Sequence, residues 1–237
     1  MKGGNIAKRL CLVGSTGLIG RAVMQGAVGR TDVRLVGVAR REVALPAGAR
    51  MEMLLADPAN WDQAIAASNA DVLVCALGTT IRREQGNQDA FRAVDYDLVL
   101  ACARAARKAN IDHMIVVSSV GADSGSSNFY MRTKGELEVD LRKAGLRRLD
   151  ILQPSLLLGR REESRPLERV AVMLGPLMNL FLHGSWRKYR AIDVGTIVEA
   201  IFALAHERSA GRFTHDYDAM HYAIRRAGEF PAIVARG

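Results

Sequence analysis

The stretch Arg9-Leu10-Cys11-Leu12-Val13-Gly14-Ser15-Thr16-Gly17-Leu18-Ile19-Gly20 decides the fold of this 237-residue chain. Its first five residues form an apolar run that is typical of a buried strand, and Arg21 to Val28 follow a helical pattern. Glycines between a strand and a helix let the main chain turn tightly and approach phosphates, and the helix start offers free N–H groups. The stretch predicts that Gly14 to Gly20 bind the pyrophosphate of a dinucleotide; a glycine-rich hairpin turn is the alternative.

Apolar runs of four to seven residues recur along the chain and predict parallel strands that are covered on both faces. They are Arg9–Val13, Val33–Ala39, Met51–Ala56, Val72–Leu77, Met114–Val117 and Leu149–Leu152. Helical patterns separate them at Leu18–Gly29, Asn60–Ser68, Asp89–Asn110 and Asn128–Ala144. The alternation predicts an α/β fold with a doubly wound parallel sheet.

The last third of the chain departs from this rhythm. A polar stretch at Gly159–Ser164 is followed by an apolar stretch at Val170–Leu182, which is too short to span a membrane. For the latter we expect a lid or core packing, with a membrane-touching or partner-binding helix as the alternative. We predict helices at Asp193–His206 and Asp216–Ala227 and a short strand at Gly211–Thr214. We therefore expect one domain over residues 1–237, with a small substrate-facing lobe over residues 155–237.

The composition is that of an ordinary globular protein and excludes several classes. The net charge is +8, but the basic residues come in scattered pairs with few aromatics, which argues against nucleic-acid binding. No apolar run reaches 18 residues, and the first residues lack the apolar stretch of a signal peptide. The three cysteines lie in apolar surroundings without Cys-x-x-Cys spacing, so we expect reduced thiols, no metal site and a cytoplasmic location.

The end of the second predicted strand bears on the choice of cofactor. Arg40 and Arg41 stand where an acid would hold the ribose 2′-hydroxyl of NAD, and arginine there suits the 2′-phosphate of NADP. We therefore expect NADP(H), with NAD as a possible cofactor; the alternative is that both arginines begin an exposed loop. Asp57 either contacts the adenine or caps a helix. Ala76, Leu77 and Gly78, after the fourth predicted strand, are expected to line the ribose and nicotinamide.

The candidate catalytic residues lie at the fifth predicted strand and the helix after it. Tyr130 and Lys134 are four residues apart, so they share one face of a helix. A free phenol with a pKa near 10 is a poor acid at neutral pH, and an ammonium group one turn away stabilises the phenolate. Ser119, or else Ser118, ends the strand at the sheet edge where such folds bind ligands. The pattern predicts a Ser/Tyr/Lys site; an exposed tyrosine with a solubilising lysine is the alternative.

The glycine pattern, Ser118-Ser119 and Tyr130-x-x-x-Lys134 resemble the short-chain dehydrogenase/reductase superfamily, in its atypical branch. The segments Ser118–Asp123, Ser127–Tyr130, Lys134–Glu136 and Arg161–Pro166 are similar to the Tat-interacting-protein oxidoreductases. The resemblance implies a Rossmann-type sheet that binds NADP(H), with Ser119, Tyr130 and Lys134 in the catalytic positions. It also implies that Pro154 and Ser155 lie near the nicotinamide, where relatives often have Pro-Gly. A fourth catalytic residue is an asparagine in many relatives, and here Asp95 and Asn110 stay open.

Two function classes follow from these observations. The first is an NADP(H)-dependent oxidoreductase that reduces a carbonyl or oxidises an alcohol of a small molecule, in which Lys134 also hydrogen-bonds the nicotinamide ribose. The second is a regulator or scaffold that binds NADP(H) with little turnover, and a sugar epimerase is a lesser third. The intact Ser/Tyr/Lys set favours the enzyme. A homodimer or a protein partner stays open, and several arginines could favour an anionic substrate, namely Arg82, Arg83, Arg160, Arg161 and Arg165.

Overall fold

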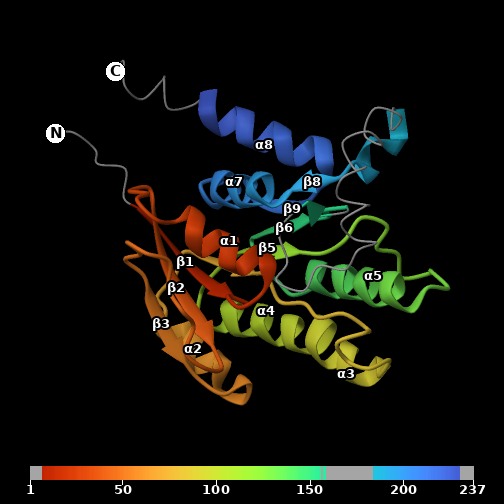
Figure 1. Cartoon of the computed structure of the whole chain (residues 1–237), viewed down its shortest axis with the longest axis horizontal. Helices are drawn as coiled ribbons and strands as arrows, with labels where there is room; N and C mark the ends of the chain where they lie inside the picture. The colour runs from red at the N-terminus through yellow and green to blue at the C-terminus, as the bar shows by residue number, and fades with distance from the viewer. Residues whose placement is uncertain (1–6, 156, 159–183, 230–237) are drawn as a thin grey trace.

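The computed structural model describes residues 7–155, 157–158 and 184–229 and is built on a parallel β-sheet (Figure 1). Across these residues the sheet has seven strands in the order β3-β2-β1-β4-β5-β6-β9. The strands are β1 (Lys8–Val13), β2 (Val33–Ala39), β3 (Glu52–Leu55), β4 (Val72–Cys75), β5 (His113–Val117), β6 (Arg148–Leu152) and β9 (Gly211–His215). A separate parallel pair joins β7 (Leu157–Leu158) to β8 (Ile192–Asp193). The predicted doubly wound parallel sheet is confirmed.

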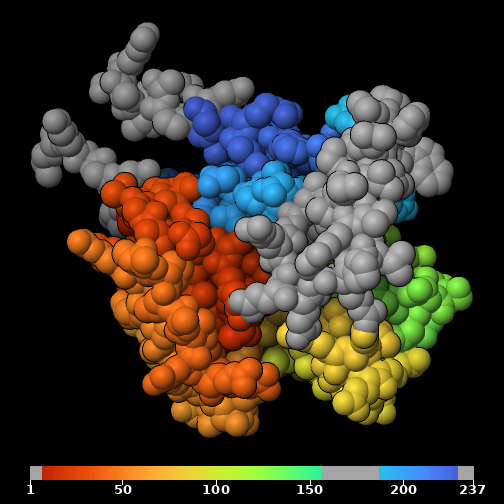
Figure 2. All heavy atoms as spheres, viewed as in Figure 1, coloured from red at the N-terminus to blue at the C-terminus, as the bar shows by residue number. Residues whose placement is uncertain are grey.

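Helices cover both faces of the sheet (Figure 1). The helices are α1 (Leu18–Gly26), α2 (Trp61–Ala67), α3 (Gln88–Arg92), α4 (Leu98–Lys108), α5 (Phe129–Arg142), α7 (Val194–Ala205) and α8 (Tyr217–Glu229), with shorter helical turns η1 (Pro58–Asn60), η2 (Ala93–Asp97) and η3 (Gly184–Tyr189). Helices α1 and α7 pack on one face, and α8 lies over α7 at the surface (Figure 2). Helices α2, α4 and α5 pack on the other face.

Strand β1 shows why the strands are continuous apolar runs rather than alternating ones. Leu10 and Leu12 point into the core under α1 and α7, while Cys11 and Val13 point into the core under α2 and α4. All four side chains are 0% exposed. Because both faces are covered by helices, every position of a central strand must be apolar.

The register of the central strands brings their carboxyl ends to one edge. Val13, the last residue of β1, pairs with Val38 of β2 and with Cys75, the last residue of β4. The strand order reverses between β1 and β4, because β2 and β3 lie on one side of β1 and the later strands on the other. Open α/β sheets bind ligands outside the carboxyl ends of the strands at such a reversal.

Several predicted boundaries differ from the structure. Strand β4 ends at Cys75 rather than Leu77. The N–H of Ala76 still donates a hydrogen bond to Val13 O, and beyond Ala76 the chain no longer pairs with β1. Helix α1 ends at Gly26, and the predicted helix Asp89–Asn110 consists of α3, the π-helical turn η2 and α4.

The predicted stretches Gly159–Ser164 and Val170–Leu182 lie outside the described residues, as do Arg160, Arg161 and Arg165. Helices α7 and α8 and strand β9 lie where the last third of the sequence predicted them, within two residues at each end. No helix in the described part of the chain is long and apolar enough to cross a membrane.

A buried ionic cluster joins β5, β6 and β9. The Asp150 carboxylate is 0% exposed and accepts hydrogen bonds from His113 Nε2 (2.8 Å), His215 Nε2 (2.8 Å) and Arg148 Nε (2.6 Å). Burial alone would raise the pKa of Asp150, but these donors lower it well below its usual range. Burial lowers the pKa of His113, although the hydrogen bond to Asp150 opposes the shift. Each charged group in this cluster therefore has a partner of the protein's own.

Candidate active site

The loop after β1 requires glycine for steric reasons. Gly14 has φ +89°, and a Cβ atom there would lie 2.5 Å from the carbonyl carbon and oxygen of Ala76. A Cβ atom on Gly20 would lie 2.1 Å from the carbonyl oxygen of Gly14. The loops after β1 and β4 are thus in direct backbone contact, and the start of α1 packs tightly against the turn. The first and last glycines of the predicted motif are explained by close approach.

Two features of this loop call for an anionic partner. Ser15 is 1% exposed, and its hydroxyl has no hydrogen-bond partner among the residues that the structure describes. Gly17 is the N-cap of α1, so no side chain caps the first turn, and that turn carries no acidic residue. A buried hydroxyl without a partner is costly, and an uncapped helix start leaves N–H groups free. Both features fit a pyrophosphate group, for which the sequence predicted Gly14 to Gly20.

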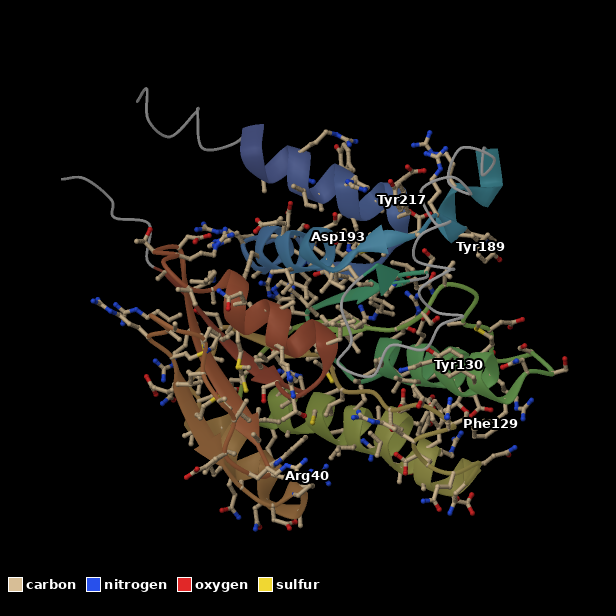
Figure 3. All side chains as sticks on the ribbon, viewed as in Figure 1. Arg40, Phe129, Tyr130, Tyr189, Asp193 and Tyr217 are labelled. Atoms are coloured by element: carbon tan, nitrogen blue, oxygen red, sulfur yellow. The ribbon has the colours of Figure 1, made fainter. Side chains whose placement is uncertain are left out.

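The residues predicted around the rest of the dinucleotide lie at the same edge. Arg40 and Arg41 directly follow β2, and both are exposed without an ion-pair partner among the described residues. Figure 3 labels Arg40. Ala76 and Leu77 after β4 are half-buried, and Gly78 is exposed. The predicted helix cap at Asp57 is confirmed, because its carboxylate accepts a hydrogen bond from Ala59 N (3.0 Å); its contact with the adenine stays a prediction.

Tyr130 and Lys134 share one face of α5, as their spacing predicted. Tyr130 is half-buried, its ring packs at 5.7 Å from the ring of Phe91, and its hydroxyl has no partner among the described residues (Figure 3). Lys134 is 4% exposed, and its ammonium lies 2.7 Å from a carboxylate oxygen of Asp95. The helix therefore presents an available phenol and, one turn later, a buried charge with a counter-ion.

Asp95 and Asn110, which the sequence left open, have different positions. Asp95 is 1% exposed, and its second oxygen accepts a hydrogen bond from Thr79 N (2.7 Å) in the loop after β4. It lies in η2, a π-helical turn, and such turns occur frequently at functional sites. Asn110 is exposed beyond the end of α4. The acid that contacts Lys134 is Asp95. A buried lysine needs a carboxylate partner, but the sequence alone does not show that Lys134 is buried.

The two serines after β5 have separate environments. Ser118 is 6% exposed, and its hydroxyl donates a hydrogen bond to Glu138 Oε1 (2.6 Å). Ser119 is half-buried, and the only hydrogen bond of its hydroxyl to the described residues is a 3.3 Å contact with the carbonyl oxygen of Val120. The geometry leaves Ser119 available to another group, in agreement with the preference for Ser119.

Pro154 and Ser155 follow β6 beside this turn. The carbonyl oxygen of Pro154 accepts a hydrogen bond from Val120 N (3.0 Å). The hydroxyl of Ser155 donates to the carbonyl oxygen of Arg190. The serine that replaces the glycine of relatives thus uses the hydrogen of its hydroxyl within the protein, while the hydroxyl oxygen can still accept a hydrogen bond.

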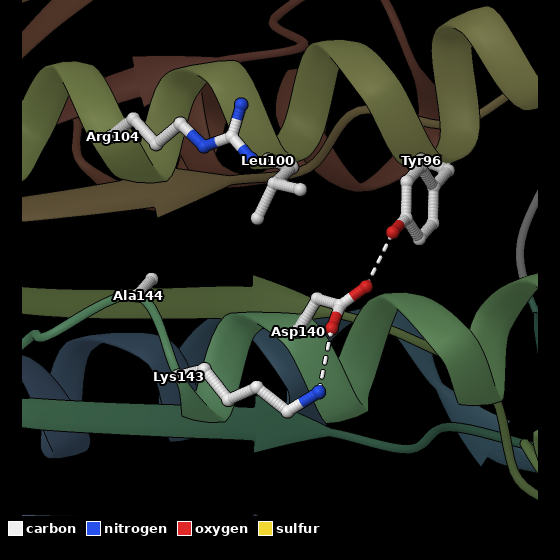
Figure 4. Close-up of a pocket in the computed structure, with 6 residues that line it drawn as sticks. All are labelled: Tyr96, Leu100, Arg104, Asp140, Lys143 and Ala144. Carbon is white, nitrogen blue, oxygen red and sulfur yellow. Dashed lines mark hydrogen bonds and ion pairs between the residues drawn. The ribbon is translucent and has the colours of Figure 1, made fainter.

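A surface pocket of about 280 Å³ lies elsewhere, between α4 and α5 (Figure 4). It is lined by Tyr96, Leu100, Arg104, Asp140, Lys143 and Ala144. The Asp140 carboxylate accepts hydrogen bonds from the Tyr96 hydroxyl and from Lys143 Nζ (3.0 Å for the lysine). None of the candidate residues lines this pocket, so it is separate from the candidate site. Within the described ranges, no group of three or more His, Cys, Asp or Glu side chains is arranged so that it could hold a metal ion.

The family model for NAD(P)H-binding proteins matches residues 14–166. The protein FMP52 of Candida albicans, named as mitochondrial, is 32% identical over 193 residues, which cover 78% of this chain and 84% of FMP52. Protein HTATIP2 of Rattus norvegicus is 32% identical over 199 residues, covering 82% of this chain and 79% of that protein. A solved structure from Bacillus halodurans, provisionally described as an NAD-dependent epimerase/dehydratase, superposes with a TM-score of 0.68 at 20% identity. The superposition covers 93% of this chain and 100% of that one.

The expected cytoplasmic location is contradicted by these relatives, because FMP52 is named as a mitochondrial protein. The expectation rested on reduced cysteines. Cys11, Cys75 and Cys102 are indeed free and buried, but any reducing compartment accommodates such thiols.

The candidate-site geometry and the comparisons agree on one cofactor class. The superposition at 20% identity supports the fold alone. The family match includes the glycine loop, Ser119, Tyr130 and Lys134, and the match to HTATIP2 confirms the resemblance inferred from the sequence. The chain therefore belongs to the NAD(P)H-binding family of Rossmann-fold proteins.

Proposed function

We propose that this protein is an NADP(H)-dependent oxidoreductase that interconverts a carbonyl and an alcohol on a small molecule. The observation that carries the proposal is the arrangement on α5: the Tyr130 hydroxyl has no partner among the described residues, and Lys134 one turn later is buried and paired with Asp95. A tyrosine and lysine kept only for solubility would lie on an exposed face. In this proposal residues 155–237 form the substrate-facing lobe of a single domain.

The residues present at the edge of the sheet suit NADP(H). The first-turn amides of α1 and the buried Ser15 hydroxyl would hold the diphosphate. Arg40 and Arg41 would bind the 2′-phosphate of NADP(H), which NAD lacks. Ala76 to Gly78 and Lys134 would lie along the nicotinamide riboside, and Pro154 and Ser155 would contact the nicotinamide.

When bound, NADPH supplies the hydride that is added to the carbonyl carbon of the substrate. The Tyr130 hydroxyl donates its proton to the carbonyl oxygen and becomes a phenolate. The Ser119 hydroxyl donates a hydrogen bond to the same oxygen and orients it. Lys134 holds a positive charge one turn from the phenolate and stabilises it, while Asp95 fixes the ammonium and ties it to the loop at Thr79.

The proposal is tested by titrating the protein with NADPH and NADH and then following NADPH oxidation over a panel of small aldehydes and ketones. We expect NADPH to bind, and Tyr130→Phe to lower kcat at least about 100-fold while the Kd for NADPH changes little. Tyr222→Phe, at a 58% exposed tyrosine on α8, is the matched control and should match the parent protein.

Two outcomes would contradict the oxidoreductase. If Tyr130→Phe turned over every reduced substrate as fast as the parent protein, the proposed acid would be wrong. If NADPH bound tightly but no carbonyl compound was reduced, the regulator or scaffold, which binds the nucleotide without turnover, would be favoured instead.

A further inference from the structure

A buried carboxylate, that of Glu138, lies on α5, one turn after Lys134. Glu138 is 6% exposed, although it is a charged residue on a helix whose neighbouring acids, Glu136 and Asp140, face outward to surface partners. Charged side chains are rarely this buried unless they are paired. The mechanism above does not use Glu138.

Glu138 is satisfied by two side chains from different strands. Ser118, after β5, donates its hydroxyl hydrogen to Oε1 at 2.6 Å. Gln153, after β6, donates from Nε2 to both carboxylate oxygens, at 2.9 Å and 3.0 Å. Arg142, on the same helix, lies 3.8 Å from Oε2. We call Glu138, Ser118 and Gln153 the Glu138 clamp.

The clamp joins α5, which carries Tyr130 and Lys134, to the turn that carries Ser119 and to the end of β6. Its Ser118 arm is adjacent to Ser119, and its Gln153 arm is adjacent to Pro154, whose carbonyl oxygen accepts a hydrogen bond from Val120 N. Ser118 N in turn donates to Leu152 O at 2.7 Å. The main chain on both sides of Ser119 is therefore fixed to the end of β6, and the clamp fixes this pair of turns to α5.

From these contacts we infer that Glu138 is a positioning residue, which sets the place of the Ser119 hydroxyl relative to Tyr130 and Lys134. The inference rests on the proposed oxidoreductase function. Glu138 acts through Ser118 and Gln153 and does not itself touch substrate or cofactor. Ser118 has the same role, which explains why two serines stand in sequence while only Ser119 is available to a substrate.

The test uses Glu138→Gln and a swapped double variant, Glu138→Gln with Gln153→Glu. The single variant has an amide at both positions and no carboxylate to accept from them. The swap again has one amide and one carboxylate, with the amide at position 138 and the carboxylate at position 153. In the swap, the carbonyl oxygen of the new amide at position 138 can still accept from Ser118. We expect Glu138→Gln to lower kcat about 10- to 100-fold, because small displacements of reacting groups carry costs of that size. The Kd for NADPH should stay within about 2-fold, because the glycine loop follows β1, which β4 separates from β5 and β6 in the sheet. The swap should recover kcat to within about 3-fold of the parent.

Glu136→Gln is the matched control, because Glu136 lies on the same helix but pairs with Arg92 at the surface. It should leave kcat and KM as in the parent. Ser118→Ala should lower kcat less than Ser119→Ala, because the former only loosens the turn while the latter removes the hydroxyl that contacts the substrate. A parent-like kcat and KM in Glu138→Gln, or no recovery in the swap, would overturn the inference.

A second readout needs no turnover, so it separates this inference from the proposed function. Hydrogen exchange of the Val120 amide reports whether the Ser119 turn stays closed on Pro154. We expect exchange to be at least about 10-fold faster in Glu138→Gln and restored in the swap, even if no substrate is ever reduced. Unchanged exchange in Glu138→Gln would show that the clamp does not hold the turn and would overturn the inference directly.

Discussion

The ionic cluster around Asp150 and the carboxyl edge around Gly14 belong to the same sheet but treat polar groups in opposite ways. In the cluster, Asp150 receives hydrogen bonds from two histidines and an arginine, and every charge has a protein partner. At the edge, the Ser15 and Tyr130 hydroxyls and the first turn of α1 have no side-chain partner among the described residues. In the cluster the protein itself supplies every hydrogen-bond partner, whereas at the carboxyl edge polar groups stay available to a ligand.

The largest effect is expected in the cluster. Asp150→Ala leaves the guanidinium of Arg148 and two imidazoles without their acceptor, so the free energy of unfolding should fall by about 3–5 kcal/mol. Asp112→Ala, at a surface ion pair with Arg107, should change it by less than about 1 kcal/mol. Denaturant unfolding measures both. Equal losses of unfolding free energy in the two variants would show that the buried cluster stabilises the fold no more than a surface ion pair does.

At the carboxyl edge, Gly14→Ala should abolish dinucleotide binding. The new methyl group would collide with the Ala76 carbonyl and reshape the loop, so we expect the Kd for NADPH to rise at least about 100-fold. Gly29→Ala is the matched control, because Gly29 has φ +78° but nothing within 4 Å of its Cβ position. It should lose only about 1–2 kcal/mol of stability and keep its affinity. Parent-like NADPH binding in Gly14→Ala would remove the loop from the site.

The two arginines after β2 should give a smaller and selective effect. Arg40→Ala and Arg41→Ala are each expected to weaken NADPH about 10-fold and leave NADH unchanged, because only NADPH carries the 2′-phosphate. Arg208→Ala removes an exposed arginine between α7 and β9 and controls for net charge. Calorimetric titration of each variant with NADPH and with NADH measures both Kd values. Equal weakening of NADPH and NADH would contradict a 2′-phosphate site.

The smallest effect concerns pH. Burial lowers the pKa of His113 in the folded protein, so the unfolded chain binds a proton more readily as the pH falls below about 6.5. The free energy of unfolding should therefore fall by up to about 1.4 kcal/mol per pH unit in that range. His113→Gln should flatten this slope, as measured by denaturant unfolding between pH 8 and pH 5. Parallel slopes in the two proteins would assign the pH dependence to other groups.

The parts of the molecule that depend on local patterns were predictable from the sequence. Buried strands appear as apolar runs, the turn after β1 needs Gly14 and Gly20 for close approach, and Tyr130 and Lys134 share a face by spacing alone. The strand ends differed by at most two residues, as at β4.

The parts that depend on distant contacts were not predictable. The π-helical turn at Asp95 lies inside what the sequence presents as one helical pattern, and only the fold brings Lys134 to it. The Ser118 hydroxyl is bound by Glu138, which lies 20 residues further along the chain, and this contact leaves the Ser119 hydroxyl available. The packing of a protein does not reveal its cellular location, and the cytoplasmic location expected from the cysteines was wrong.

A crystal structure of the protein with NADPH tests the central claim most directly. The claim is that the polar groups without a protein partner at the carboxyl edge bind a dinucleotide. It should show diphosphate oxygens within hydrogen-bonding distance of the Ser15 hydroxyl and the first-turn amides of α1, and the nicotinamide ring beside Tyr130. A dinucleotide bound elsewhere, with the Ser15 hydroxyl still without a partner, would contradict the account.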